Sequence, residues 1–105
     1  MKRGEVRWYK FRPPDKKRPV VILTRNSALD FLGEVTVAPV TSTIRDIPTE
    51  VALGPSDGMP MECAVNLDHV QTVSRARIGG LITVLDTDVM TAVRGALLFA
   101  LGFRA

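Results

Sequence analysis

Chemically versatile side chains are scarce in this chain of 105 residues, which has one cysteine, Cys63, and one histidine, His69. A lone cysteine cannot form an intramolecular disulfide, which favours a reducing compartment. A lone histidine excludes a pair of catalytic histidines within one subunit. Because the carboxylates are spread singly along the chain, neither a zinc site nor a two-metal nuclease centre is predicted. We therefore expect no metal and no other cofactor.

Long hydrophobic runs and nucleotide-binding motifs are also missing. The most apolar stretch, residues 96–103, is too short to span a bilayer, and no apolar signal segment follows the basic N-terminal residues. Neither a Walker-type phosphate loop nor a G-x-G-x-x-G motif after a strand is present, which argues against nucleotide-dependent chemistry. We expect a cytoplasmic protein in which residues 1–105 form a single domain.

Neither Cys63 nor His69 is favoured as a catalyst by its sequence context. Glu62 precedes Cys63, and its negative charge should raise the pKa of the thiol, so a buried structural thiol is the favoured interpretation. His69 lies within a predicted strand, where a histidine more often has a structural role.

Positive charge gathers at one end of the chain. Residues 1–18 contain eight basic and two acidic residues, whereas the remainder contains six basic and nine acidic ones. Trp8, Tyr9 and Phe11 are interleaved with these cations. Cations that bind phosphates, together with aromatic rings that stack on bases, are typical of single-stranded nucleic-acid binding. Basic patches also bind membranes and acidic proteins, so charge alone leaves those partners open.

The pattern of apolar residues predicts a mainly β fold with one C-terminal helix. Asp86 is the expected N-cap of this helix, and Gly102 is its expected C-terminal stop. The apolar residues of the helix extend beyond one face. A dimer interface, a groove for a partner or scattered surface residues could each explain the extra apolar residues. Pro39 implies an edge position or a bulge in its strand, and residues 12–18 should form an exposed loop. Five or six short strands before a helix favour a small β-barrel or a strongly curved sheet. The expected strands are residues 5–11, 19–24, 34–41, 49–53, 64–73 and 78–83.

With metals, thiols and histidine pairs set aside, the remaining catalytic groups are arginine, lysine, hydroxyls and backbone amides. These groups bind phosphates and stabilise developing negative charge. RNA can be cleaved on such groups because its own 2′-hydroxyl is the nucleophile, which gives a 2′,3′-cyclic phosphate and a 5′-hydroxyl. DNA lacks the 2′-hydroxyl and would not be cut.

Four segments, in the same order along the chain, resemble motifs of the MazF/PemK (Kid) toxin family. This resemblance implies an SH3-like barrel, a homodimer, metal-independent cleavage of single-stranded RNA, and a MazE-like antitoxin as partner. The family's catalytic arginine and threonine match Arg18 and Thr41, and the adjacent Ser42 is expected to bind phosphate. The four segments are residues 3–8 (RGEVRW), 18–23 (RPVVIL), 35–42 (VTVAPVTS) and 65–73 (VNLDHVQTV).

Some positions depart from the family pattern. The loop of residues 12–17 is short, His69 stands where glutamine is usual, and Thr43 stands where glutamine or asparagine often follows the Thr-Ser pair. These changes affect the expected cut sequence more than the chemistry, and they leave mRNA, tRNA loops and rRNA loops as targets. The residues expected to bind RNA are Trp8, Arg12, Lys16, Lys17 and Ser42.

Two other functions share the basic N-terminal region. A CcdB-like toxin would bind DNA gyrase without cleaving anything, and an SH3-like module could bind RNA without activity. The Arg-Pro and Pro-x-Thr-Ser motifs, at Arg18 and Thr41, favour the ribonuclease.

Overall fold

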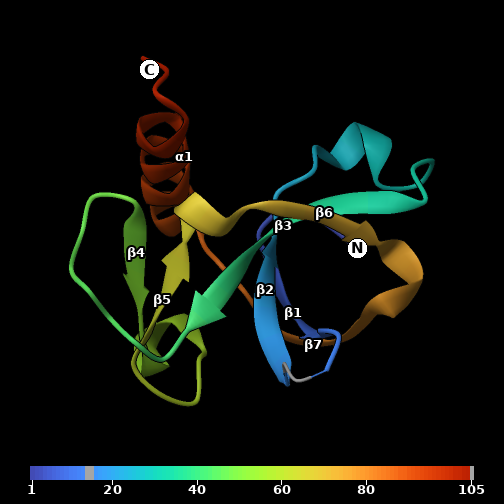
Figure 1. The fold of residues 1–105 in the computed structure, drawn as a ribbon, viewed down its shortest axis with the longest axis horizontal. Coiled ribbons are helices and arrows are strands. Elements are labelled where there is room, and N and C mark those ends of the chain that lie inside the picture. Colours follow the sequence, from blue (N-terminus) through green and yellow to red (C-terminus); the bar gives the residue numbers. More distant parts are fainter. Residues whose placement is uncertain (14–15, 105) are drawn as a thin grey trace.

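The computed structural model describes residues 1–13 and 16–104, in which seven strands precede one α-helix (Figure 1). Four short 3-10 helices, η1 to η4, connect the strands. Their bounds are Asn26–Ala28, Pro55–Asp57, Leu67–His69 and Arg75–Arg77. The strands are β1 (Glu5–Lys10), β2 (Lys17–Ile22), β3 (Glu34–Thr41), β4 (Glu50–Leu53), β5 (Cys63–Asn66), β6 (Gln71–Ser74) and β7 (Ile78–Val84), and the helix is α1 (Thr87–Leu101).

The strands form one antiparallel, strongly curved sheet in the order β4-β5-β3-β2-β1-β7, and β6 also pairs with β3. Among the described residues β4 does not pair with β7, so the expected barrel is a curved sheet that does not close. The strand count is seven rather than five or six because the single strand expected over residues 64–73 is interrupted by η3.

Strand β3 lies at the centre of this sheet and changes partners along its length. On one side it pairs with β2, from Ile22↔Val37 to Val20↔Pro39. It also pairs with β6 through residues 34–37 and with β5 through residues 40–41. Pro39 lies between these last two pairings, where a residue without an N–H group is tolerated. The sequence predicts an edge position or a bulge at Pro39. The break between β6 and β5 has the same effect, because neither strand pairs with Pro39 on that side of β3.

The two faces of β2 pack into two different hydrophobic clusters. Val21 belongs to the cluster beneath α1, with Val6, Ala38 and Val93, while Val20 and Ile22 join a second cluster. Burial on both faces explains the uninterrupted β-branched run of β2. The second cluster also contains Tyr9, Leu29, Val35, Val37 and Val73.

Helix α1 begins and ends as its sequence predicts. The Oδ1 atom of Asp86 accepts a hydrogen bond from the Val89 amide at 2.9 Å, and Gly102 ends the helix with a φ of 79°. Val93 and Ala96 are buried, but Leu101 near the C-terminal end is 59% exposed. The apolar face is therefore only partly covered. None of the described helices has the length and apolar character needed to cross a membrane.

The loop between β1 and β2 is shorter than expected. Strand β2 begins at Lys17, so Lys17 and Arg18 are strand residues that pair with Lys10 and Tyr9. The expected loop therefore loses its last two residues, because antiparallel pairing with β1 extends past Pro19. Residues 14 and 15 of this loop lie outside the described residues.

Candidate functional site

Arg18 and Thr41 lie at the same end of the β2–β3 pair. The two strands are antiparallel, so the start of β2 lies beside the end of β3, next to the pair Val20↔Pro39. Arg18 comes two residues before Val20, and Thr41 comes two residues after Pro39, so both share the face of that pair. Arg18 is exposed and Thr41 is half-buried. The guanidinium and the hydroxyl that the sequence selected thus come from neighbouring strands and one face.

Arg18 lines a cleft with a volume of about 270 Å³, hereafter the Arg18 cleft. The other lining residues are Phe11, Pro39, His69 and Gln71. They come from the residue after β1, from β3, from η3 and from β6, which are far apart in the sequence. Sequence reasoning selected neither His69 nor Gln71 for this site.

His69 reaches the cleft because the chain leaves the strand geometry at η3. The Asn66 side chain accepts a hydrogen bond from the Asp68 amide at 3.0 Å, which starts this turn. The Thr49 hydroxyl donates to the Asp68 carboxylate at 2.6 Å and ties η3 to the segment before β4. Asn66 was the available sequence signal, since asparagine commonly forms such side-chain turns. His69 itself is exposed.

A second cleft, of about 410 Å³, adjoins the first and shares Phe11 and Gln71 with it. We call it the Arg77 cleft, and the two clefts together the groove. The Arg77 guanidinium lies 5.8 Å from the centroid of the Tyr9 ring, within cation–π range, and Tyr9 packs edge-on against Phe11. Arg12 also lines this cleft. The groove therefore combines arginines with aromatic rings.

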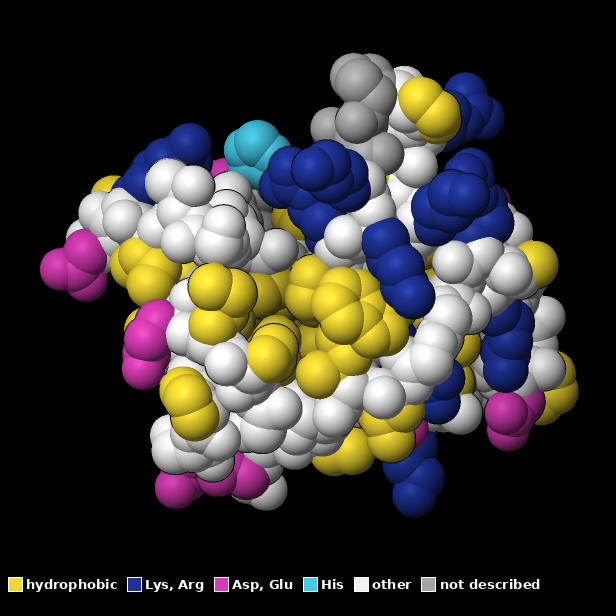
Figure 2. Space-filling model, turned by 90° about the horizontal axis from the view of Figure 1, so that it is seen from below, with side chains coloured by type: hydrophobic (Ala, Val, Ile, Leu, Met, Phe, Trp, Pro, Cys, Tyr) yellow, Lys and Arg dark blue, Asp and Glu magenta, His cyan; other side chains and the backbone are white. Residues whose placement is uncertain are grey.

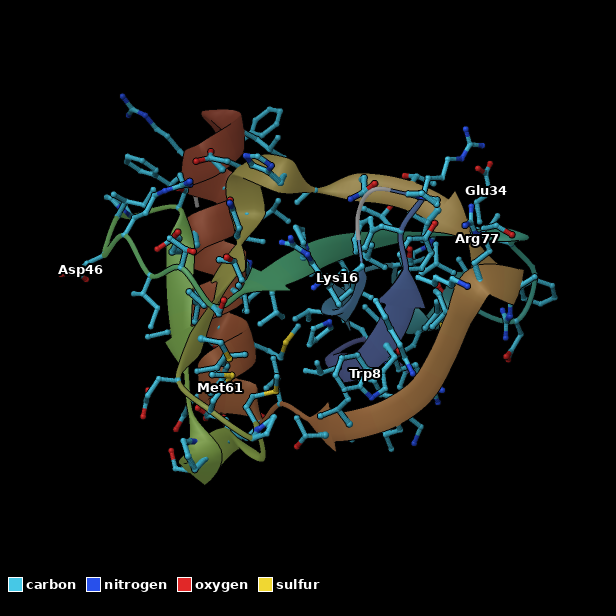
Figure 3. All side chains as sticks on the ribbon, turned by 60° about the horizontal axis from the view of Figure 1, so that its bottom comes forward. Trp8, Lys16, Glu34, Asp46, Met61 and Arg77 are labelled. Carbon is cyan, nitrogen blue, oxygen red and sulfur yellow. The ribbon has the colours of Figure 1, made fainter. Side chains whose placement is uncertain are left out.

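Trp8 and Lys17 lie on the opposite face of β1 and β2 from Arg18. The Lys17 ammonium nitrogen is 5.1 Å from the centroid of the Trp8 ring. Trp8 and Lys17 are the direct chain neighbours of the paired residues Tyr9 and Arg18, and successive strand residues point to opposite faces. Trp8 belongs to β1, and Figure 3 shows it on the side of β1 that is next to β7. The residues expected to bind RNA are thus divided between two faces of the sheet, with Arg12 in the groove and Trp8 and Lys17 outside it. Lys16 and Ser42 are exposed at the neighbouring strand ends.

Some of the basic side chains in residues 1–18 contact other groups of the protein. The Arg7 side chain contacts the Glu5 carboxylate at 2.7 Å and the Gly79 carbonyl at 3.0 Å, which joins β1 to β7. Arg3 donates to the Leu23 carbonyl at 2.8 Å. These two arginines support the sheet. Figure 2 shows other cations gathered beside the histidine along one edge of an apolar patch.

The Thr41 hydroxyl is oriented by the turn that follows β3. Its Oγ1 atom accepts a hydrogen bond from the Thr43 amide at 3.1 Å. The hydroxyl hydrogen is thereby directed away from that amide and can be donated to a phosphate oxygen. Ser42, the next residue, is exposed and follows the strand directly.

Cys63 has the structural role that its sequence context indicates. Its side chain is buried in the cluster beneath α1. Burial raises the pKa of the Cys63 thiol, and the charges of Glu62 and Asp57 add to this effect. Among the described residues, no group of three or more His, Cys, Asp or Glu side chains could hold a metal ion.

Comparison with known proteins identifies one family. Residues 2–101 match the family model of the PemK-like, MazF-like toxins of type II toxin–antitoxin systems. The probable endoribonuclease MazF5 of Mycobacterium tuberculosis H37Rv is 42% identical over 99 residues, which cover 90% of each chain.

Two solved structures give the same result. The Mycobacterium tuberculosis toxin MazF-mt6 superposes with a TM-score of 0.89 at 32% identity, over 96% of this chain and 99% of that one. An endoribonuclease from a mycobacterial species, in complex with its cognate antitoxin, superposes with a TM-score of 0.88 at 28% identity, over 100% of this chain and 98% of that one.

Proposed function

The chain belongs to the PemK-like, MazF-like toxins of type II toxin–antitoxin systems and is an endoribonuclease toxin, and we propose that Arg18 and Thr41 form its catalytic site. The observation that supports this site is the common end of β2 and β3, where both side chains lie on one face beside the Arg18 cleft. The substrate is single-stranded RNA, and its cleavage inhibits translation and growth.

The proposed reaction needs no nucleophile from the protein. The 2′-hydroxyl attacks the adjacent phosphorus, and the bond from phosphorus to the 5′-oxygen breaks. Arg18 binds the phosphoryl oxygens and stabilises the added negative charge, as a planar guanidinium with five N–H donors can. Thr41 donates its hydroxyl hydrogen to the same phosphate and fixes its orientation. The products are a 2′,3′-cyclic phosphate and a 5′-hydroxyl.

The groove supplies the path for the RNA on either side of this phosphate. Arg12 and Arg77 are placed for backbone phosphates, and the exposed part of Phe11 offers a stacking surface for a base. Ser42 follows Thr41 and provides a further hydroxyl for phosphate. Lys16 and Lys17 extend the positive surface beyond the groove, and Trp8 adds an aromatic ring beside Lys17.

A MazE-like antitoxin and a second copy of the chain are the proposed protein partners. The endoribonuclease whose solved structure is similar to this chain is bound to its cognate antitoxin, which supports the first partner. Exposed apolar side chains near the end of α1, Phe99, Leu101 and Phe103, support the second, because a homodimer would remove them from water. We propose that the toxin acts in the cytoplasm.

The two alternative functions are not favoured. A CcdB-like gyrase toxin and an inert RNA-binding module both lack the activity after which the curated relative is named, an endoribonuclease. Both would also leave the position of Arg18 and Thr41, on one face at the same end of β2 and β3, without a use.

Cleavage of total RNA by the purified protein in EDTA tests the proposed function. We expect discrete cuts with 5′-hydroxyl and 2′,3′-cyclic phosphate ends, and an intact single-stranded DNA control. An oligonucleotide with a single 2′-deoxy substitution at the mapped cut should also stay intact, because its nucleophile is missing. Cleavage at that deoxy position, or cuts that need added metal, would contradict the mechanism.

Thr41→Val should reduce the cleavage rate by roughly 10²-fold, because it removes a donor to the phosphate while keeping the size of the side chain. Thr41→Ser is the matched control and should keep most of the activity, since the hydroxyl remains. The measurement is single-turnover cleavage at saturating RNA. Equal rates for both variants would show that the hydroxyl is not used.

Arg12→Ala should weaken RNA binding more than Lys17→Ala, although each removes one positive charge. Arg12 lines the groove, whereas Lys17 packs on Trp8 on the other face. Affinity for a non-cleavable RNA, measured against salt concentration, checks this. The Arg12 variant should lose about one unit of the log–log salt slope, which corresponds to one phosphate contact. A larger loss of RNA affinity in Lys17→Ala than in Arg12→Ala would instead indicate that the RNA binds along the face that carries Trp8.

A further inference from the structure

The chemistry proposed for the groove lacks a group that readily takes up a proton at neutral pH. Attack by the 2′-hydroxyl requires removal of its proton, and a general base works best when it titrates near the working pH. Arginine side chains stay protonated in proteins, and threonine hydroxyls do not accept a proton readily. Arg18 and Thr41 therefore stabilise charge well but are poor bases.

His69 lines the Arg18 cleft, and histidine is the side chain that ordinarily titrates between pH 5 and 8. The remaining lining residues are Arg18, which is cationic, and Phe11, Pro39 and Gln71, which carry no charge. Within η3, His69 follows Asp68, and the Asp68 carboxylate accepts a hydrogen bond from the Thr49 hydroxyl. The imidazole is exposed, so it can exchange protons with water. It is also the chain's single histidine.

We propose that His69 is the general base of the RNA cleavage reaction, an inference that rests on the proposed function. The neutral imidazole takes the proton of the 2′-hydroxyl as the bond from the 2′-oxygen to phosphorus forms. The bond from phosphorus to the 5′-oxygen breaks while Arg18 stabilises the phosphoryl oxygens. A water molecule donates a proton to the 5′-oxygen and recovers one from the imidazolium. The net reaction moves one proton from the 2′-oxygen to the 5′-oxygen.

The position of His69 fits this role. Arg18 reaches the cleft from β2, and His69 reaches it from η3, so a phosphate bound to the guanidinium has the imidazole within the same cavity of about 270 Å³. The hydrogen bonds of Asn66 and Thr49 to Asp68 hold the turn that carries His69.

The pH–rate profile of His69→Gln tests the assignment. With wild-type protein the single-turnover rate at saturating RNA should rise as pH increases and then level off, because the neutral imidazole is the active form. The variant should be slower by roughly 10²-fold near neutral pH, and its rise should disappear. His69→Ala should regain activity when free imidazole is added, which a purely structural role would not allow.

Two controls separate the possible outcomes. Binding of RNA that carries a 2′-deoxy nucleotide at the cut should be unchanged in His69→Gln, and Arg18→Ala should not be rescued by imidazole. The inference is overturned if His69→Gln keeps the wild-type rate and pH profile, or if it weakens RNA binding without changing the saturated rate. Failure of the wild-type protein to cleave RNA, or full activity of Arg18→Ala, would instead reject the proposed function itself.

Discussion

Arg18→Ala is expected to lower the rate of RNA cleavage at saturating substrate by roughly 10²- to 10³-fold, which is typical of losing one group that stabilises transition-state charge. Arg18 is exposed at the start of β2, so its removal leaves both hydrophobic clusters intact. The melting temperature should therefore stay close to that of the wild type, while the cleavage rate falls.

Two further arginine variants show whether the effect belongs to the site. Arg18→Lys keeps the charge but replaces the planar set of N–H donors with a single ammonium, so we expect activity between those of wild type and Arg18→Ala. Arg25→Ala removes an equal charge from an exposed position outside the groove and should cleave normally. A loss of activity in Arg25→Ala equal to that in Arg18→Ala would mean that overall charge, rather than the site, is being measured.

Gly58→Ala is expected to destabilise the fold by about 3 kcal/mol, through backbone strain and a steric clash together. Gly58 has a φ of 88°, which residues with a side chain rarely adopt. An added Cβ would lie 2.8 Å from the Cβ of Thr83 and closer still to its hydroxyl oxygen. That hydroxyl donates to the Asp57 carbonyl at 2.9 Å, which joins the turn before β5 to β7.

Gly102→Ala is the matched control for this prediction. Gly102 has a similar φ of 79°, but nothing lies within 4 Å of an added Cβ. It should therefore cost only the backbone strain, about 1 kcal/mol. Thermal unfolding should show a drop in melting temperature of about 10–20 °C for Gly58→Ala and about 5 °C for Gly102→Ala. Equal drops would show that Thr83 moves aside at no cost.

Periodicity and capping residues predicted most of the fold, because they act over a few residues. The ends of α1 follow from Asp86 and Gly102, and burial of β2 on both faces follows from its β-branched run. The break in the expected strand over residues 64–73 was missed because apolar residues continue through it, and Asn66 alone signals the turn. The open sheet depends on long-range pairing, which no local pattern records.

The candidate site was predicted only in part, for a related reason. Arg18 and Thr41 were selected through the family resemblance, and the sheet brings their strand ends together. His69 was interpreted as structural because its segment was expected to be a strand, in which it had no reason to reach Arg18. The division of Trp8 and Lys17 from Arg12 follows from strand alternation, which became clear once the register of β1 and β2 was known.

The wide sequence separation of the residues in the Arg18 cleft has a consequence for how the toxin is made. Phe11 and Arg18 belong to the first hairpin, but Gln71 begins β6, which must pair with the first half of β3. Such non-local pairing forms slowly and late. In a nascent chain on the ribosome, the basic N-terminal residues are therefore synthesised well before the Arg18 cleft can form. We expect such a chain not to cleave RNA until β6 has emerged and paired with β3.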